Sequence, residues 1–140
     1  EDYLSYLVDM DESEILPGVM PILNYLKDCN QLIALGSASK NARPILEKTG
    51  TLSYFDAIVD GNDVSNAKPD PEVFLLAAKL LNTKPEDSIV FEDSVAGVQA
   101  ANSGGMISVG IGEAATLREA KYIFKDFTLM DKTFIDDLIK

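Results

Sequence analysis

The sequence predicts an α/β fold in which a Rossmann-like parallel sheet is covered by helices on both faces. Short apolar segments alternate along the chain with longer segments whose apolar residues recur at helical spacing. The short segments are almost continuously apolar, as expected of strands that are buried on both faces. Glycine, proline and asparagine separate the two kinds of segment.

The first elements follow from their spacing and from the residues that bound them. Residues 19–28 have apolar side chains at helical spacing after a Pro-Gly pair, which predicts a helix. Leu32–Leu35 is a short apolar run and predicts a buried strand. The next helix is expected at residues 41–48, where a proline is tolerated in the first turn, and the next strand at residues 57–59.

The second half of the chain continues the alternation. A polar loop at residues 61–71 leads to a helix at residues 71–81, whose apolar residues again recur at helical spacing. The apolar run at 88–91 predicts a strand, and Ser94 begins the helix that follows it. The last expected elements are a strand at 106–109, an edge strand at 122–124 and a closing helix at 133–139.

The composition fits one globular domain and excludes several classes of function. The chain has 140 residues, of which 46% are hydrophobic, and no apolar run approaches the ~18 residues of a membrane span. The net charge of −11 argues against binding to nucleic acid, which requires a basic surface. The acidic composition without a signal-peptide pattern suggests a cytoplasmic protein.

Two residue types that often carry catalysis are scarce. Histidine is absent, and Cys29 is the only cysteine. Catalytic triads, thiol–histidine pairs, intrachain disulfides and zinc clusters are therefore excluded. The chemistry of this chain must come from carboxylates, hydroxyls and lysines, with or without a hard metal ion.

Small polar residues follow the expected strand at 32–35. Ser37 and Ser39 supply hydroxyl groups, and Ala38, Lys40 and Asn41 supply backbone N–H groups where a helix begins. Free amides at a helix start favour an anion such as phosphate. The alternative without a ligand is an ordinary helix cap, because serine and asparagine are preferred there.

A lysine and two carboxylates follow the other strands. Lys68 precedes a proline, so its backbone is extended, and its ammonium can reach a phosphate, although most loop lysines are simply solvated. Glu92 and Asp93 end a buried strand, where adjacent carboxylates are costly unless a cation is present. They predict a Mg²⁺ site, with a helix cap by Asp93 or Ser94 as the alternative.

The predicted sheet would bring these groups together. Ligands of parallel sheets bind beyond the carboxyl ends of the strands, and all of these residues follow such ends. An anion cradle, a neutralising lysine and a Mg²⁺ site are the parts that phosphoryl transfer requires. The arrangement therefore predicts a site for that reaction.

Three motifs resemble the haloacid dehalogenase superfamily: SASKN at 37–41, AKPDPEVF at 67–74 and FEDSVAGVQAANSGG at 91–105. The resemblance runs in register from about Ile15 to the end and is specific for the branch whose helical cap is inserted early in the sequence. SASKN further resembles the β-phosphoglucomutases within it. The resemblance implies a core of the haloacid dehalogenase type and Mg²⁺ as the cofactor.

The resemblance also implies a role for each matching residue. The residues implied to bind phosphate are Ser37, Ala38, Ser39, Lys40, Asn41 and Lys68. Among them Ser37 and Lys68 would be catalytic, because they would contact the transferring phosphoryl group, and Lys68 would also steady the nucleophile. Glu92 and Asp93 would hold Mg²⁺.

The superfamily's nucleophile is the first aspartate of an Asp-x-Asp-Gly motif that ends an N-terminal strand. Asp9 and Asp11 are candidates, but no glycine follows them and too few residues separate them from the next motif. We therefore expect residues 1–14 to be the tail of the helical cap and residues 15–140 to be an incomplete core that lacks its central strand. Such a chain would need an N-terminal segment of the same protein and would be inactive alone.

The implied function is Mg²⁺-dependent phosphoryl transfer on a small phosphorylated sugar. A β-phosphoglucomutase would interconvert β-glucose 1-phosphate and glucose 6-phosphate through an aspartyl-phosphate. A sugar- or polyol-phosphate phosphatase of the same branch is the first alternative, because cap residues mostly decide between the two. A non-catalytic module that keeps the fold is the alternative of another class.

Overall fold

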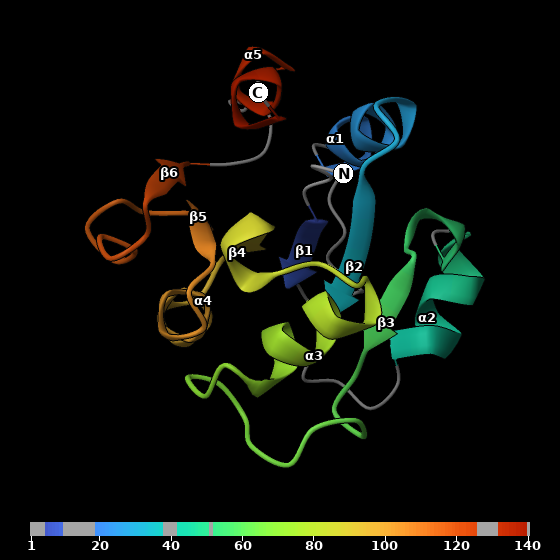
Figure 1. Cartoon of the computed structure of the whole chain (residues 1–140), viewed down its shortest axis with the longest axis horizontal. Coiled ribbons are helices and arrows are strands. Elements are labelled where there is room, and N and C mark those ends of the chain that lie inside the picture. The colour runs from blue at the N-terminus through green and yellow to red at the C-terminus, as the bar shows by residue number, and fades with distance from the viewer. Residues whose placement is uncertain (1–4, 10–18, 38–41, 51, 126–131, 140) are drawn as a thin grey trace.

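A six-stranded sheet organises the computed structural model, which describes residues 5–9, 19–37, 42–50, 52–125 and 132–139. All strands are parallel, and their order is β3-β2-β1-β4-β5-β6 (Figure 1). The strands are β1 (Ser5–Asp9), β2 (Leu32–Gly36), β3 (Ala57–Val59), β4 (Ser88–Glu92), β5 (Ile107–Ile111) and β6 (Tyr122–Phe124). This confirms the parallel α/β fold.

Five α-helices are described beside the sheet. They are α1 (Val19–Asp28), α2 (Ala42–Thr49), α3 (Glu72–Leu80), α4 (Val95–Ser103) and α5 (Lys132–Ile139). Each lies within about two residues of the range that the sequence predicts, as is usual for helix ends. Short 3₁₀ turns at Leu52–Tyr54 and Pro85–Asp87 complete the connections.

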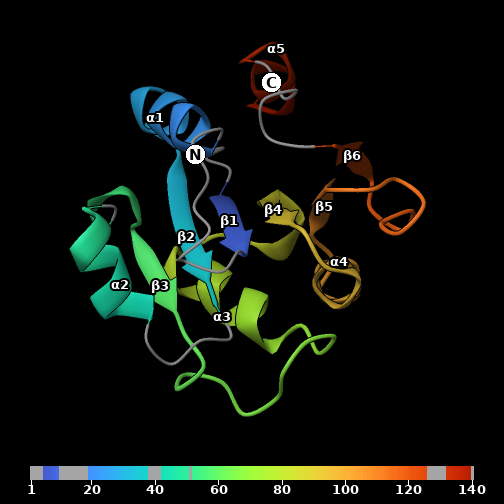
Figure 2. The same ribbon diagram turned by 180° about the vertical axis from the view of Figure 1, so that it is seen from behind.

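The side chains of the central strands alternate between two hydrophobic clusters, because successive residues of a strand point to opposite faces. One cluster joins Tyr6, Val8 and Phe91 to α1, α2 and α5. The other joins Leu7, Ala34 and Val90 to α3 and α4. Helices therefore cover both faces, and the two views of the ribbon show the sheet between them (Figures 1 and 2).

The centre of the sheet is occupied by β1, which the sequence does not predict. Asp9 is in register with Gly36 of β2 and Glu92 of β4. This structure therefore has a central strand, formed by residues 5–9, where the sequence leads us to expect a missing strand and these residues in the tail of a cap. A short apolar run cannot be assigned to strand or helix by periodicity alone, and here it satisfies the backbone groups of both neighbours.

The rest of the expected cap tail, residues 1–4 and 10–14, lies outside the described residues. None of the helices that the structure describes is long and apolar enough to cross a membrane.

Candidate active site

The carboxyl ends of four neighbouring strands lie at one edge of the sheet. Asp9 of β1 aligns with Gly36 and Glu92, and Gly36 aligns with Val59 of β3. The residues that directly follow β2, β3 and β4 are Ser37, Asp60 and Asp93. The topology thus brings three polar strand ends together around the end of β1.

A pocket of about 420 Å³ at this edge contains both Ser37 and Lys68. Ser37 is only 3% exposed, and its backbone N–H donates a hydrogen bond of 2.8 Å to the carbonyl of Val59, which holds it against β3. Ala96 of α4 and the loop residues 64–67 form other parts of the wall. The structure therefore places in one pocket the hydroxyl and the lysine that the sequence singles out.

The ammonium of Lys68 points toward the end of β4. Its Nζ atom lies 3.7 Å from Oε2 of Glu92, whose side chain is fully buried, while the side chain of Lys68 is 20% exposed. A buried carboxylate needs a nearby positive charge, and Lys68 provides it. Lys68 is thus held at the sheet edge by an interaction with one of the two predicted metal ligands.

Glu92 also organises the start of α4. Its Oε1 atom accepts hydrogen bonds from the backbone N–H of Asp93 (3.0 Å), the backbone N–H of Ser94 (2.9 Å) and the hydroxyl of Ser94 (2.9 Å). The Ser94 hydroxyl in turn accepts from the N–H of Gly97 at 3.0 Å, so Ser94 caps the helix as the sequence allows. Oε1 of Glu92 is therefore fully used inside the protein.

Asp93 differs from its neighbour because its side chain is exposed at the same edge. One buried and one exposed carboxylate bear on how the predicted Mg²⁺ site could be formed. Within the described residues no three acidic, histidine or cysteine side chains gather as a metal cluster. An exposed carboxylate still suits Mg²⁺, which takes one or two protein carboxylates and completes its shell with water and phosphate oxygens. Asp93 is suited to be such a ligand. Glu92 could contribute only its Oε2 atom to a metal ion, because Oε1 already accepts three hydrogen bonds.

The sequence did not single out the network that holds α2 to the end of β3. Arg43 bonds to the carboxylate of Asp60 and donates to the carbonyl of Ile58 at 2.8 Å. Asp60 is 4% exposed, and its backbone N–H donates to Asp63 at 2.9 Å. The position of Asp60 directly after a strand was the only signal in the sequence, because its partner comes from a distant helix.

Glu72, at the start of α3, is a second residue that the sequence did not single out. Its two carboxylate oxygens accept hydrogen bonds from the backbone N–H groups of Ser65 (3.0 Å) and Asn66 (2.8 Å). These two bonds hold the pKa of Glu72 below its usual value, since both favour the charged carboxylate.

Four predicted phosphate-binding residues, Ala38, Ser39, Lys40 and Asn41, lie outside the described residues. The structure describes both ends of that segment, Ser37 at the pocket and α2 beginning at Ala42.

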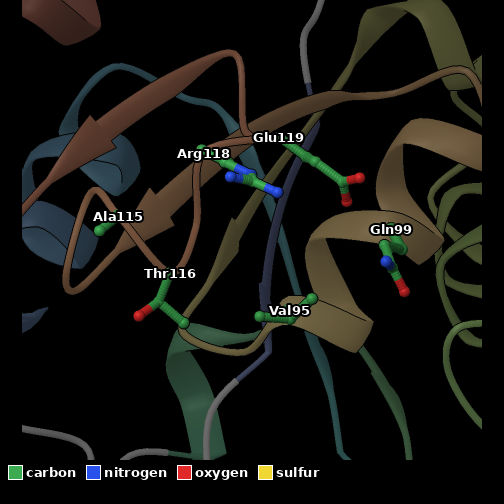
Figure 3. A pocket seen from close by; sticks show the side chains of 6 residues that line it. All are labelled: Val95, Gln99, Ala115, Thr116, Arg118 and Glu119. Carbon is green, nitrogen blue, oxygen red and sulfur yellow. The ribbon is translucent and has the colours of Figure 1, made fainter.

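A second pocket of about 350 Å³ lies between α4 and the loop that follows β5 (Figure 3). Arg118 and Glu119 from the loop after β5 face Val95 and Gln99 of α4 across it. None of the residues predicted from the sequence lines this pocket. The pocket with Ser37 and Lys68 is therefore the candidate active site.

Comparison with known proteins identifies the family of the chain. A family model described as haloacid dehalogenase-like hydrolase matches residues 1–105. The chain is 37% identical over 131 residues to a β-phosphoglucomutase from Bacillus subtilis, covering 91% of this chain and 58% of that protein. It is 39% identical over 119 residues to a phosphorylated carbohydrates phosphatase from Thermotoga maritima, covering 81% and 54%.

A crystal structure of a β-phosphoglucomutase from Clostridium difficile superposes with a TM-score of 0.84 at 38% identity, covering 93% of this chain and 58% of that one. The chain thus spans less than two thirds of the length of each of these relatives. The family model, the sequence identity and the shared fold agree. The chain belongs to the haloacid dehalogenase-like hydrolase family.

Proposed function

We propose that this chain is the core part of a Mg²⁺-dependent phosphoryl-transfer enzyme of the cytoplasm that acts on a small phosphorylated sugar, and that it is a β-phosphoglucomutase. The observation that carries the proposal is the shared pocket of Ser37 and Lys68 beside Glu92 and Asp93. A transferring phosphoryl group needs hydrogen-bond donors and positive charge around its oxygens, and this pocket offers both.

Each described residue has a defined task in this proposal. The hydroxyl of Ser37 donates a hydrogen bond to a phosphoryl oxygen, and Lys68 places its positive charge against the same group. Asp93, assisted by Glu92, holds Mg²⁺, which when bound would neutralise further phosphoryl charge. The backbone of Ala38 assists Ser37 at the transferring phosphoryl group, and Ser39, Lys40 and Asn41 hold the second phosphate of the bisphosphate.

The proposed reaction passes one phosphoryl group through an aspartate. The C6 hydroxyl of β-glucose 1-phosphate attacks the aspartyl-phosphate, so that the new O6–P bond forms, the bond from the aspartate to phosphorus breaks, and the hydroxyl proton passes to a base. The aspartate then attacks the C1 phosphoryl group of the resulting bisphosphate. Glucose 6-phosphate leaves with the proton restored to O1, and the aspartyl-phosphate is regenerated.

We propose that the attacking aspartate comes from a segment of the same protein that precedes Glu1. The relatives exceed this chain in length, and no glycine follows Asp9 or Asp11 as the nucleophile motif requires. Asp9 nevertheless ends the central strand of this structure. Only one strand fits between β2 and β4, so in the proposed whole protein the upstream strand takes that position and residues 5–9 leave it.

The test uses the protein extended by its natural upstream sequence. It receives β-glucose 1-phosphate, Mg²⁺ and a trace of glucose 1,6-bisphosphate, while glucose 6-phosphate and free phosphate are followed together. Glucose 6-phosphate without release of phosphate would support the mutase. Residues 1–140 alone should show neither product.

A phosphatase of the same branch is the second candidate, favoured by the likeness to the phosphorylated carbohydrates phosphatase. In that reaction the aspartate takes the phosphoryl group from the sugar phosphate and the sugar leaves. Water then attacks the aspartyl-phosphate in place of a sugar hydroxyl, so free phosphate would appear in place of glucose 6-phosphate. Absence of both products would contradict the two enzymatic proposals and favour a non-catalytic module.

The variant D9N decides where the nucleophile lies. Asparagine keeps the size of the side chain but is a poor nucleophile. If the nucleophile is upstream, the extended protein with D9N should keep its activity within about twofold, since Asp9 then makes no bond to phosphorus. Loss of activity in D9N would assign the attack to Asp9 of β1 and refute the upstream nucleophile.

A further inference from the structure

The loop between β3 and α3 forms one wall of the candidate active site. Its residues Ser65, Asn66, Ala67 and Lys68 line the pocket that contains Ser37. Ser65 and Asn66 also line a second hollow, together with Glu72 of α3. Ser65 and Asn66 therefore border both the pocket and the hollow that contains Glu72.

The carboxylate of Glu72 closes the loop from residue 65 to residue 72 into a ring of hydrogen bonds. Glu72 accepts the backbone N–H of Ser65 with Oε2 and that of Asn66 with Oε1, so each oxygen holds one of two successive amides. These bonds join residue 72 to residues 65 and 66, and Lys68 lies inside the closed segment. Hydrogen bonds to an ionised acceptor are stronger than neutral ones, and two parallel bonds also fix orientation.

Two further hydrogen bonds stabilise the same loop at the residues that follow Lys68. The backbone N–H of Glu72 donates to Oδ1 of Asp70 at 2.9 Å, and the backbone N–H of Asp70 donates to the carbonyl of Ala67 at 3.1 Å. Glu72 thus holds the loop before Lys68 with its side chain and the loop after Lys68 with its backbone. The ammonium of Lys68 is left directed at Glu92, 3.7 Å away.

We propose that Glu72 is a positioning residue of the active site, which acts through the backbone of Ser65 and Asn66 to hold the pocket wall and the ammonium of Lys68 in place. The proposal deepens the proposed function and rests on it. Glu72 does not line the pocket, so it touches no substrate there. Its location at the first turn of α3 further favours its negative charge, because helix N-termini attract anions.

The experiment compares E72Q with E86Q. Glutamine keeps the shape of Glu72 but loses the charge and one acceptor, so it cannot accept both amides. Glu86 is an exposed glutamate of the turn Pro85–Asp87, at the amino end of β4 and far from the pocket, which makes E86Q the matched control. Amide hydrogen exchange is measured for residues 1–140, and kinetics for the extended protein.

In E72Q the exchange rates of the Ser65 and Asn66 amides should rise about tenfold, since charge-assisted hydrogen bonds are lost. The kcat should fall about tenfold with KM within about twofold, because Lys68 acts on the transferring group more than on ground-state binding. E86Q should change none of these quantities, and the two variants should melt at similar temperatures.

Unchanged exchange at Ser65 and Asn66 would overturn the proposal, because the bonds to Glu72 would not hold the wall. Faster exchange with unchanged kcat would also overturn it, since the wall would not position Lys68. If the wild-type extended protein transfers no phosphate at all, the proposed function fails. The exchange measurement then still decides whether Glu72 holds the loop.

Discussion

Replacement of Gly97 by alanine tests whether the side chain of Glu92 is fixed in its buried position against α4. A Cβ atom at Gly97 would stand 1.9 Å from both Cδ and Oε2 of Glu92. An ordinary contact needs at least 3.4 Å, so the methyl group and the carboxylate would overlap by about 1.5 Å. Glu92 is 1% exposed, and its Oε1 atom already accepts three hydrogen bonds, so the carboxylate cannot move without breaking them.

Two opposing effects decide the size of the change. Alanine has a better helix propensity than glycine, which alone would stabilise α4 by about 1 kcal/mol. Displacing Glu92 breaks hydrogen bonds to a charged acceptor, each worth about 1.5–3 kcal/mol. With one or two of them lost, less the gain in propensity, G97A should lower the free energy of unfolding by about 0.5–5 kcal/mol, so the clash outweighs propensity.

The assay is urea unfolding of residues 1–140 carrying G97A, E92A or both. In the E92A background the carboxylate is gone, so alanine at position 97 should be neutral or stabilising by up to about 1 kcal/mol. A strong coupling between the two positions is therefore expected. A G97A protein as stable as the wild type, or more stable, would refute the close contact between Gly97 and Glu92.

Further changes at the same edge separate charge, metal binding and loop bracing. K68M should lower activity of the extended protein by about 100-fold or more, because it removes the positive charge beside the phosphoryl group. It should also lower the free energy of unfolding by about 1–3 kcal/mol, because Glu92 stays buried without this cation. D93N should lower Mg²⁺-dependent activity by about 100-fold. It should leave the free energy of unfolding in urea within about 0.5 kcal/mol of the wild type, since Asp93 is exposed. Equal losses of stability in K68M and D93N would contradict this contrast. R43A should lower the free energy of unfolding by about 1–2 kcal/mol in the same assay, because the buried carboxylate of Asp60 would lose its partner. The loss stays small because Arg43 is half exposed and solvent screens its charge. An unchanged unfolding midpoint would show that the network is not needed for stability.

Several elements could be predicted because their signals are local. The apolar runs that became β2, β3, β4, β5 and β6 stand between breakers, and each helix has its own periodicity and its own end signals. The strand-end rule then placed Ser37, Lys68, Glu92 and Asp93 at one edge without any knowledge of contacts. The shared pocket of Ser37 and Lys68 confirms that these two lie together.

Other features depend on partners that are distant in the sequence. The apolar run at Tyr6–Val8 fits a strand or a helix, and only its pairing with β2 and β4 makes it the central strand. Glu92 and Asp93 are adjacent carboxylates in the sequence. Only the packing of Gly97 and Lys68 around one of them buries Glu92 and leaves Asp93 exposed.

The sequence by itself thus determined the class of fold and the chemical groups at the carboxyl edge, because strand length, helical spacing and strand-end residues are properties of short segments. The tertiary structure alone decided which strand is central, which carboxylate is buried, and that Arg43 bonds to Asp60 and Glu72 accepts two amides of the β3–α3 loop. These outcomes depend on burial and hydrogen bonding between segments far apart in the chain, and no local pattern carries that information.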